Sequence, residues 1–560
     1  MIETIVNMFD IWTDAQGVKS RTRVKGVENI SLEGIDKLRE LILELAVRGK
    51  LVPQNVNDET AAELLKKIEE EKKRLVNEGK IKKQEVFPGI DDDEKPYKIP
   101  SNWEWTQLAN IYYTISPSDK KLKNSDIIEA GEYPVVDQGK AFIAGYTNSK
   151  KLLIEIPGPV VVFGDHTTVK KYIDFDFVAG ADGTKILRPY KMNERYFYTY
   201  LLSYKLEGKG YSRHFKFLNE NYFALPPLAE QHRIAAKVDE LMTLCDKLEK
   251  EQFNNLKIHQ VLVKTLVGTL TQATDTNEFQ AAWERISVHF DTLFCTEDSI
   301  DQLKQTILQL AIMGKMVSQD PNDQPANELL KQIAKAKEKL IEEGKLKKTA
   351  PLAEVSENEK KFLLPKGWEW KRLNDVIDVR DGTHDSPKEA FGQITYPLIT
   401  SQNFENGSIN FDTAKRISEV DYIEISKRSL VERFDILFSM IGGNLGNQVM
   451  VDTDIPFSVK NVALFKYYSK AYTSPFFIKK TMEYIALTLQ SRAIGGAQPF
   501  VSLGFLRNIV IAVPPIAEQN RIVSKIDELF YICDLLKEKV QKSNIYKGLL
   551  SKTIVKEVVQ

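Results

Sequence analysis

Apolar residues recur at alternating steps of four and three along two segments that each follow a Pro-Pro pair. Proline cannot continue a helix from upstream, but it is well suited to begin one. Steps of four and three keep the apolar side chains on one narrow helical face, as in a coiled coil. The pattern therefore predicts two long helices with the same seam. The seam positions are Ile234, Val238, Leu241, Cys245 and Leu248 in the first helix, and Ile522, Ile526, Leu529, Cys533, Leu536 and Val540 in the second.

These helices belong to a longer internal repeat. Residues Leu38–Lys83 return as Leu303–Lys348 without a gap and with about half of the positions identical, and IPSNWEWTQL at Ile99 returns as LPKGWEWKRL at Leu364. The Pro-Pro segments match at a larger offset, so the extra length of the second copy lies inside the intervening block. The chain is thus two copies of helix, block and helix. Helices of about 40 residues would extend about 60 Å and fix the distance between the blocks, with an antiparallel arrangement and internal pseudo-two-fold symmetry. Glycine at positions 79 and 344 is placed to end the first helix of each copy.

The two blocks, residues 99–224 and 364–512, mix short strand-like apolar runs with turns rich in Gly, Asp, Asn and Pro. VVVF at Val160 and YIDFDFV at Tyr172 are such runs in the first block, and DILFSMIG at Asp435 is one in the second. Each block then has one helical stretch, Tyr196–Lys205 or Ser474–Ser491. The predicted fold class is α+β, with two globular α+β domains separated by long antiparallel coiled-coil helices.

Composition narrows the class of protein. A chain of 560 residues with 42% hydrophobic and 28% charged residues is long enough for about three to five structural units. Neither a membrane-length apolar stretch nor a signal-peptide pattern is present, so a cytoplasmic protein without membrane contact is expected. Cys245, Cys295 and Cys533 are too few and too far apart for a disulfide scaffold or zinc cluster, which predicts reduced, structural cysteines. The formal charge of −1 gives no global hint of a polyanion partner.

Local clusters nevertheless contain residue types that contact nucleic acid. HTTVKKY and GYSRHFKF in the first block, and DGTHDSPK in the second, combine His and basic residues with aromatic or hydroxyl groups suited to phosphates and base edges. SQNFENGSIN and GGNLGNQ supply amides of the kind that pair with adenine. For any single residue, an ordinary surface or turn role remains the alternative. The candidate DNA-contacting residues are Asp165, His166, Lys170, Lys171, Arg213, His214, Lys216, Thr383, His384, Ser386, Lys388, Gln402, Asn403, Asn444 and Arg492.

Catalytic signatures are missing from the sequence. Both Pro-Pro pairs lie between apolar residues, unlike the Asn or Asp followed by Pro-Pro and an aromatic residue of an adenine methyltransferase. No Gly-Lys is followed by Ser or Thr, as a triphosphate-binding loop requires. The six His residues show no close metal-ligand spacing. A non-catalytic chain without a cofactor or metal of its own is therefore expected.

The combined motifs resemble the specificity subunit of type I restriction-modification systems over nearly the whole chain. The resemblance rests on PPLAEQ-RI followed by DEL after Leu225 and again after Val513, on ELAVRGKLVPQ at Glu44, and on VVFGDHT, GADGTK, DGTHDSP, PLITS and DILFSMIG. One position departs from the family pattern: Phe434 stands where a glycine usually precedes Asp-Ile-Leu, which should alter a local turn. The implied organisation is an N-terminal helical region (1–98), target recognition domain 1 (99–224), a central conserved helical region (225–363), target recognition domain 2 (364–512) and a C-terminal conserved helix (513–560).

The resemblance implies a subunit that reads a bipartite, asymmetric site on double-stranded DNA through its two domains. Two modification subunits would bind S-adenosylmethionine and flip the target adenines, and restriction subunits would use ATP and magnesium. A near-neutral specificity chain fits a DNA clamp that partner subunits complete. The alternatives are a duplicated coiled-coil scaffold that binds non-DNA partners, and a nuclease or methyltransferase. Divergence of the blocks within a preserved frame favours two different half-sites.

Overall fold

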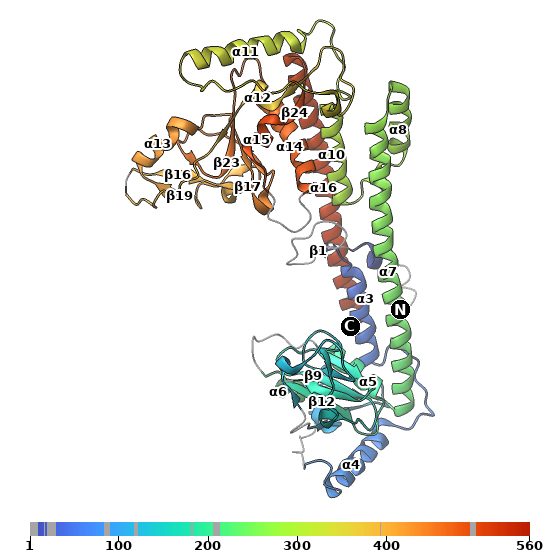
Figure 1. The fold of residues 1–560 in the computed structure, drawn as a ribbon. Helices are drawn as coiled ribbons and strands as arrows, with labels where there is room; N and C mark the ends of the chain where they lie inside the picture. The colour runs from blue at the N-terminus through green and yellow to red at the C-terminus, as the bar shows by residue number, and fades with distance from the viewer. Residues whose placement is uncertain are drawn as a thin grey trace. The chain divides into compact units, whose positions relative to one another are not determined.

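The computed structural model describes residues 9–15, 17–18, 30–82, 90–116, 121–180, 183–204, 213–392, 394–492 and 500–559. The chain divides into two compact units, residues 1–257 with 542–560 and residues 258–541, which are described separately. Each unit contains a sheet domain attached to a long helix (Figure 1). The predicted α+β class, with two sheet domains and long helices, is confirmed.

The first unit contains α2 (Phe9–Asp14), α3 (Glu33–Val47), α4 (Ala61–Asn77), α5 (Glu194–Ser203), α6 (Phe215–Asn219) and most of α7 (Leu228–Gln272). Its strands are β1 (Gly17–Val18), β2 (Ile30–Ser31), β3 (Glu104–Gln107), β4 (Tyr112–Ile115), β5 (Lys121–Leu122), β6 (Tyr133–Val136), β7 (Gly145–Thr147), β8 (Leu153–Ile154), β9 (Val160–Gly164), β10 (Lys170–Ile173), β11 (Phe177–Gly180), β12 (Thr184–Pro189) and β13 (Tyr222–Leu225).

The second unit contains the end of α7, then α8 (Thr276–Val288), α9 (Phe290–Leu293), α10 (Glu297–Ile312), α11 (Ala326–Glu342), α12 (Leu373–Val376), α13 (Glu419–Ser429), α14 (Pro475–Arg492), α15 (Leu503–Asn508) and most of α16 (Ile516–Val559). Its strands are β14 (Glu369–Arg372), β15 (Asp378–Asp381), β16 (Tyr396–Ile399), β17 (Phe404–Glu405), β18 (Ser408–Ile409), β19 (Lys415–Ile417), β20 (Ile436–Ser439), β21 (Gln448–Met450), β22 (Ser458–Val459), β23 (Val462–Lys466) and β24 (Val510–Val513).

The two domains share the main features of their strand topology although their sequences differ. An antiparallel four-stranded sheet has the order β10-β9-β12-β4 in the first domain and β21-β20-β23-β15 in the second. A second sheet pairs β6 with β11 in parallel in the first domain and β16 with β22 in parallel in the second. This sheet has five strands in the first domain, where β5 also pairs with β11 in parallel, and three strands in the second. A two-stranded antiparallel ladder, β3 with β13 or β14 with β24, connects each domain to the helix that follows it. The duplication therefore extends through the divergent blocks.

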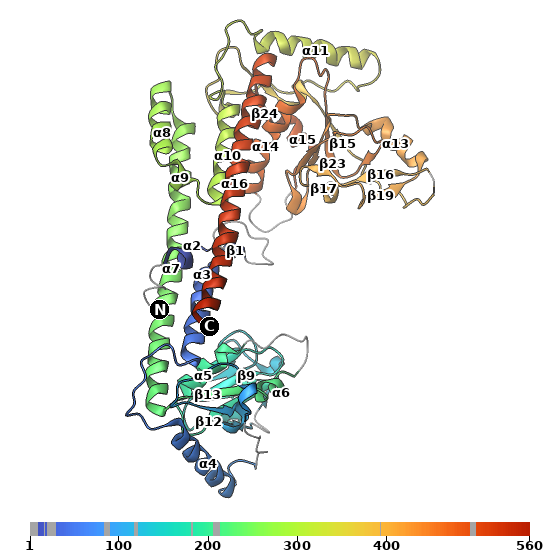
Figure 2. The ribbon, with the colours of Figure 1, turned by 180° about the vertical axis from the view of Figure 1, so that it is seen from behind.

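The coiled-coil seam is confirmed in both units. Ile234, Val238 and Cys245 are buried along α7, and Ile522, Ile526 and Cys533 are buried along α16. Arg39 on α3 donates to Glu249 at 2.6 Å, so α3 lies along α7, and Lys537 on α16 binds Asp301 on α10 at 2.8 Å (Figures 1 and 2). Both pairs are antiparallel. Arg39 contacts Glu249 while Gln54, beyond the end of α3, contacts Glu230 at the start of α7, and Asp301 contacts Lys537 while Lys304 contacts Asp534.

The predicted length of about 40 residues is correct for α7, with 45 residues, and α16, with 44. It is wrong for the first helix of each copy, which is broken into α3 and α4 or α10 and α11. Gly49 and Gly314 end α3 and α10 at φ +67° and +69°, where a Cβ would lie 2.5 Å from Pro100 and 2.4 Å from Pro365. Glycines 79 and 344 follow the ends of α4 and α11 at φ +69° and +71°, as predicted.

Buried carboxylates join each domain to its long helix. Glu230 on α7 accepts a hydrogen bond from Trp103 Nε1 at 3.0 Å and another from Gln54 Nε2 at 2.7 Å. In the second unit, Glu518 on α16 accepts from Trp368 Nε1 and Gln319 Nε2, each at 3.0 Å. Burial raises the pKa of both carboxyl groups. In each unit, the Trp of the repeated WEW segment thus donates a hydrogen bond to the Glu of the PP-x-AEQ motif. We call this buried contact, together with the Gln donor, the interlock.

The glutamine of the same motif makes further hydrogen bonds between the long helix and the domain. Gln231 donates to the Pro226 carbonyl at 2.9 Å and accepts from the Asn193 backbone at the start of α5. Gln519 repeats this arrangement, donating to the Pro514 carbonyl at 3.0 Å and accepting from the Ser474 backbone at 3.1 Å. Each motif therefore ties together the last strand of a domain, the helix packed on its sheet and the long helix.

The cysteines differ in their environments, although all three are free thiols. Cys245 and Cys533 are buried in the seams, and burial raises the pKa of both thiols, in keeping with a packing role. Cys295 is exposed, so the structural role predicted for it is wrong. It directly precedes Thr296, the N-cap of α10, and its Sγ lies 3.8 Å from His259 Nε2.

Over the described ranges, helices long enough to cross a bilayer are all too polar to do so. The same ranges bring together no three His, Cys, Asp or Glu side chains with the geometry to hold a metal ion.

Replacing Glu230 with alanine should loosen the first domain alone. The buried Trp103 and Gln54 donors would lose their acceptor, at a cost of about 1–3 kcal/mol for each unsatisfied group. Hydrogen-exchange mass spectrometry should show faster amide exchange in β3 and α5 and unchanged exchange in β14 and α14. Glu518→Ala is the matched control and should reverse this pattern. Equal effects of either variant on both units would contradict the interlock.

Candidate nucleic-acid interface

Three loops of the first domain meet at the carboxyl ends of the parallel strands β6 and β11. Gln138 follows β6, and its Oε1 accepts from the His166 backbone at 3.2 Å. Asp165, in the turn between β9 and β10, donates its backbone N–H to the Gly183 carbonyl at 2.8 Å. Gly183 directly precedes β12, and a Cβ there would lie 2.6 Å from the Gln138 side chain. This convergence defines the loop edge of the first domain.

The predicted residues Asp165, His166 and His214 are brought together at this edge. Asp165 Oδ1 accepts from the Phe215 backbone at 2.8 Å, and its carbonyl accepts from the His214 backbone at 2.8 Å. Asp165 and His214 are both buried, so they shape the start of α6 instead of facing solvent. Arg213 and Lys216 flank His214 and are exposed. Both cations are available to a ligand.

Lys170 and Lys171 point into the domain. Lys170 Nζ donates to the Tyr204 carbonyl at 2.8 Å, and burial lowers the pKa of this lysine to about 8. Lys171 is buried and donates to the carbonyls of Asp137 and Ala141, at 2.8 and 2.5 Å. Burial also lowers the pKa of Lys171, an effect that the Asp137 carboxylate opposes. Lys171 therefore holds the loop after β6 in place.

The second domain has the equivalent edge at the carboxyl ends of β16 and β22. Lys460 follows β22 and donates its backbone N–H to the Ile399 carbonyl at 2.9 Å. Thr383 is buried, and its backbone bonds to Val459 and Asn461 on either side of this turn. His384, Ser386 and Lys388 continue outward from Thr383 as exposed residues. His384 Nε2 lies 2.6 Å from Asp381 Oδ2.

The amide-rich stretches have mixed roles. Asn403 is buried and accepts from the Thr400 backbone at 2.9 Å, so it caps the short turn after β16. Gln402 beside it is exposed, and Asn444 donates weakly to the Ser401 carbonyl at 3.5 Å. Arg492 ends α14, and its side chain lies outside the described residues. Gln402 is therefore the member of this group that faces solvent most freely.

Sequence reasoning missed Gln138, Lys185, Lys460 and Asn461. Lys185 Nζ lies 4.0 Å from Asp165 Oδ2 and over the Phe215 ring. Gln138 comes two residues after the apolar run YPVV, and Lys460 and Asn461 directly follow FSV. A search for polar residues immediately after buried strands would have found three of the four.

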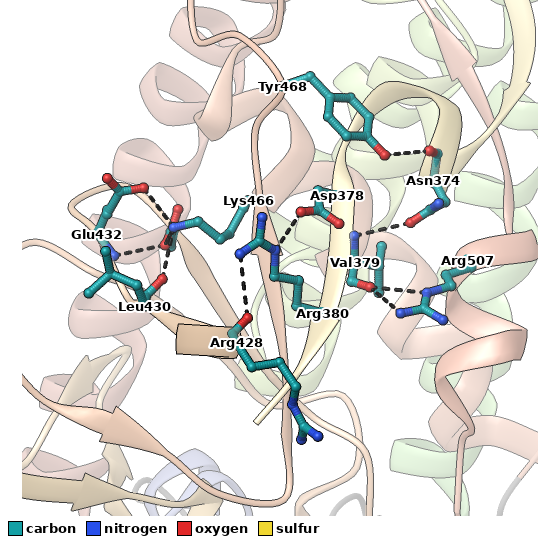
Figure 3. Close-up of polar contacts among 11 residues, drawn as sticks. Asn374, Asp378, Val379, Arg380, Arg428, Leu430, Glu432, Lys466, Tyr468 and Arg507 are labelled. Carbon is teal, nitrogen blue, oxygen red and sulfur yellow. Dashed lines mark hydrogen bonds and ion pairs between the residues drawn. The ribbon is translucent and has the colours of Figure 1, made fainter. Parts of the chain in front are cut away.

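Arginines clamp β15, the strand that leads into the Thr383 loop (Figure 3). Arg507 on α15 donates twice to the Val379 carbonyl, at 2.9 and 3.0 Å. Arg380 donates to Asp378 at 2.5 Å and to the Arg428 carbonyl at 3.4 Å. Arg428 in turn donates to the Gly382 carbonyl at 2.8 Å. The loop therefore emerges from a base fixed on both sides.

Comparison with known proteins decides the family. Residues 100–257 and 365–543 match the family model described as type I restriction modification DNA specificity domain. The chain is 38% identical over 565 residues to the type I restriction enzyme EcoAI specificity subunit of Escherichia coli, with 95% of each chain covered. It is 36% identical over 582 residues to the EcoEI specificity subunit of the same organism, with 96% of each covered. This chain belongs to the family of type I specificity subunits.

Two solved structures align with most of this specificity-subunit chain. A chain from a structure of type I R-M complex assembly and conformational transition aligns over 99% of its length and 83% of this chain, with 16% identity and a TM-score of 0.45. The HsdS subunit from Thermoanaerobacter tengcongensis aligns over 97% of its length and 82% of this chain, with 16% identity and a TM-score of 0.35.

At Phe434, where the family pattern has a glycine, the backbone takes a conformation that favours glycine. Phe434 adopts φ +71°, a left-handed conformation that glycine accepts and a bulky residue resists. Lys466 holds the turn in place. Its Nζ binds Glu432 and Asp435, which lie on either side of Phe434, at 2.7 Å, and the Leu430 carbonyl at 2.9 Å (Figure 3). Lys466 lowers the pKa of Glu432, while burial raises that of Asp435. The phenylalanine thus keeps a glycine-like turn.

Phe434→Gly should be more stable than Phe434→Ala. Both variants lose the ring, but alanine keeps a Cβ in the left-handed region, which costs about 1–2 kcal/mol. Part of this difference is offset because glycine loses more entropy on folding. Calorimetry of the intact chain should give a higher unfolding temperature for the glycine variant, by about 2–4 °C. The opposite order would contradict the strained turn.

Lys171→Met should lower the stability of the first domain by about 1–3 kcal/mol, because the Asp137 and Ala141 carbonyls would lose their buried donor. Lys216→Met removes the same charge from an exposed site, where its carboxylate neighbour lies 3.9 Å away, and should change stability by less than about 0.5 kcal/mol. Thermal unfolding of both variants measures the difference. Equal losses would contradict the positioning role of Lys171.

Proposed function

We propose that this chain selects the DNA sequence on which a type I restriction-modification complex acts. Each sheet domain reads one half of a bipartite, asymmetric site in the major groove of double-stranded DNA. The helices hold the two half-sites at a fixed spacing and dock two modification subunits, to which restriction subunits are added. Within this proposal the chain is non-catalytic, and the complex acts in the cytoplasm.

The observation that carries the proposal is one topology with two different loop edges. Both domains place loops at the carboxyl ends of one parallel strand pair, β6 with β11 or β16 with β22. The exposed side chains there differ: Arg213 and Lys216 in the first domain, and His384, Ser386, Lys388 and Gln402 in the second. Two domains that bound the same ligand would not need different side chains at these edges. Two domains that read different half-sites would need them.

The local chemistry of these edges supports contact with DNA. Exposed lysine and arginine supply phosphate contacts, which position a protein on the duplex, and exposed amide, imidazole and hydroxyl groups supply base-edge contacts. The candidate DNA-contacting residues therefore include a buried group and an exposed group. Asp165, Lys171, His214, Thr383 and Asn403 shape the loops, and the exposed candidates make the contacts. The division at residues 98, 224, 363 and 512 remains our assignment of the domain boundaries.

The partners carry the chemistry in this proposal. The modification subunits bind S-adenosylmethionine and transfer a methyl group to adenine, and the restriction subunits use ATP and magnesium to translocate and cut. The interlocks at Glu230 and Glu518 give the two copies of the frame the same local structure. Two equivalent frames suit two copies of one modification subunit.

Methylation mapping tests the proposal. The chain and its cognate modification subunit are co-expressed in a host that lacks DNA methylation, and the genome is sequenced by a long-read method that detects methyladenine. The expected result is one bipartite motif with methylated adenine in both halves. An assembled complex that leaves the genome unmethylated would contradict the proposal and favour a scaffold for other partners.

A further inference from the structure

We propose that Asn461 is a specificity-determining residue of the second domain, which reads a purine edge, preferably adenine, in the major groove with His384 as its partner. This inference rests on the proposed function. Asn461 lies in the two-residue turn between β22 and β23, at the loop edge where the candidates from DGTHDSPK converge.

The backbone of this turn is held from both sides. The Lys460 N–H donates to the Ile399 carbonyl at 2.9 Å, at the end of the neighbouring parallel strand. Thr383 donates to the Val459 carbonyl at 2.9 Å and accepts from the Asn461 N–H at 3.2 Å. Because β15 beneath Thr383 is clamped by Arg507, the turn is a rigid platform. Base readout needs such rigidity, since a reading side chain must be held close to its productive geometry.

The backbone conformation of Asn461 indicates that asparagine stands here, in place of glycine, because of its side chain. Asn461 is exposed and has φ +55°, in the left-handed region. The equivalent turn of the first domain places Gly183, φ +92°, directly before β12. Glycine therefore satisfies the fold at this position, and it does so without a steric penalty. Asparagine is tolerated there and adds an amide at the outer surface of the turn.

His384 orients that amide. Its Nδ1 lies 3.2 Å from Asn461 Oδ1, and its Nε2 lies 2.6 Å from Asp381 Oδ2. The imidazole is thus fixed at both nitrogens while 66% of its side chain stays exposed. The Asn461 oxygen keeps a second lone pair, and its NH₂ group supplies donors. One acceptor and one donor side by side match the N6 amino group and N7 of adenine.

Cations surround the pair. Lys460 Nζ contacts the Ser386 hydroxyl, and Lys415 Nζ binds the Pro387 carbonyl at 2.6 Å. Lys388 is exposed in the same loop. Ammonium groups of this kind are suited to phosphates, whose contacts supply charge without sequence information. The arrangement is a polar reading pair with cations nearby.

The test uses the assembled complex with the modification subunit. Methylation rates are measured on duplexes that differ at single base pairs of the half-site assigned to the second domain. Asn461→Gly keeps the left-handed turn and removes the amide. We expect selectivity at one base pair to fall about tenfold or more, because a bidentate pair contributes that much discrimination. Selectivity in the other half-site should not change.

Asn461→Asp is the second variant. It keeps an oxygen toward His384 and replaces the donor with an acceptor, so preference at the same base pair should shift away from adenine. Lys191→Gly is the matched control, because Lys191 is also exposed and left-handed, φ +43°, in the turn between β12 and α5 of the first domain. It should leave selectivity unchanged.

The outcomes separate the two proposals. Unchanged selectivity ratios for Asn461→Gly, in a complex that still methylates a bipartite site, would overturn the role of Asn461 and leave the proposed function intact. A lower rate on every duplex with no change in the ratios would also overturn it. If the unmodified complex methylates no bipartite site, the proposed function fails instead.

Discussion

Each sheet domain of this chain is held to its long helix by a buried carboxylate that satisfies an indole N–H and a side-chain amide. A buried charge of this kind is unfavourable unless donors surround it, and the raised pKa of Glu230 and Glu518 records that cost. The geometry is therefore demanding: the tryptophan, the glutamine and the first turn of the helix must all be in place. The adjacent glutamines, Gln231 and Gln519, bind the last strand and the helix packed on the sheet. The rest of each domain is built outward from this joint.

The joint explains why the two blocks diverge without losing their fold. Residues that make it lie at the block boundaries, in WEW and PP-x-AEQ, and these segments are nearly identical in both copies. Between them, the strand order is preserved while the loops at the far ends of the parallel strands differ in length and chemistry. The exposed side chains of these loops can change at little cost in stability, while buried ones such as Asp165 and Thr383 hold the loops in place. Loops can therefore acquire new recognition chemistry while the frame stays constant.

Much of the fold follows from the sequence because it depends on periodic patterns. The four-and-three spacing identified the buried face of α7 and α16, and the repeat identified the two domains. The break after α3 was harder to foresee, because its decisive feature is the close approach of Pro100 to Gly49, residues distant in sequence. The candidate site was foreseen less well. Lys171 and Lys216 look equally basic in the sequence, yet tertiary contacts bury the first and leave the second exposed. Asn461 belongs to no cluster of basic or amide residues, although its place directly after a buried strand is visible in the sequence; its left-handed turn depends on tertiary contacts.

The near-zero net charge follows from the same division of roles. Several lysines and arginines on the helices are paired with carboxylates three or four residues away, as in Lys37 with Glu40 and Arg74 with Glu71 and Glu78. Such pairs keep the helices hydrated and add little field at a distance, since exposed ion pairs are screened by salt. Exposed cations also lie at the loop edges, as Arg213 and Lys388 do. Net charge averages over all of these groups, so it does not report how charge is distributed along the chain. For a protein proposed to bind DNA within a larger clamp, the distribution of charge is thus more informative than its sum.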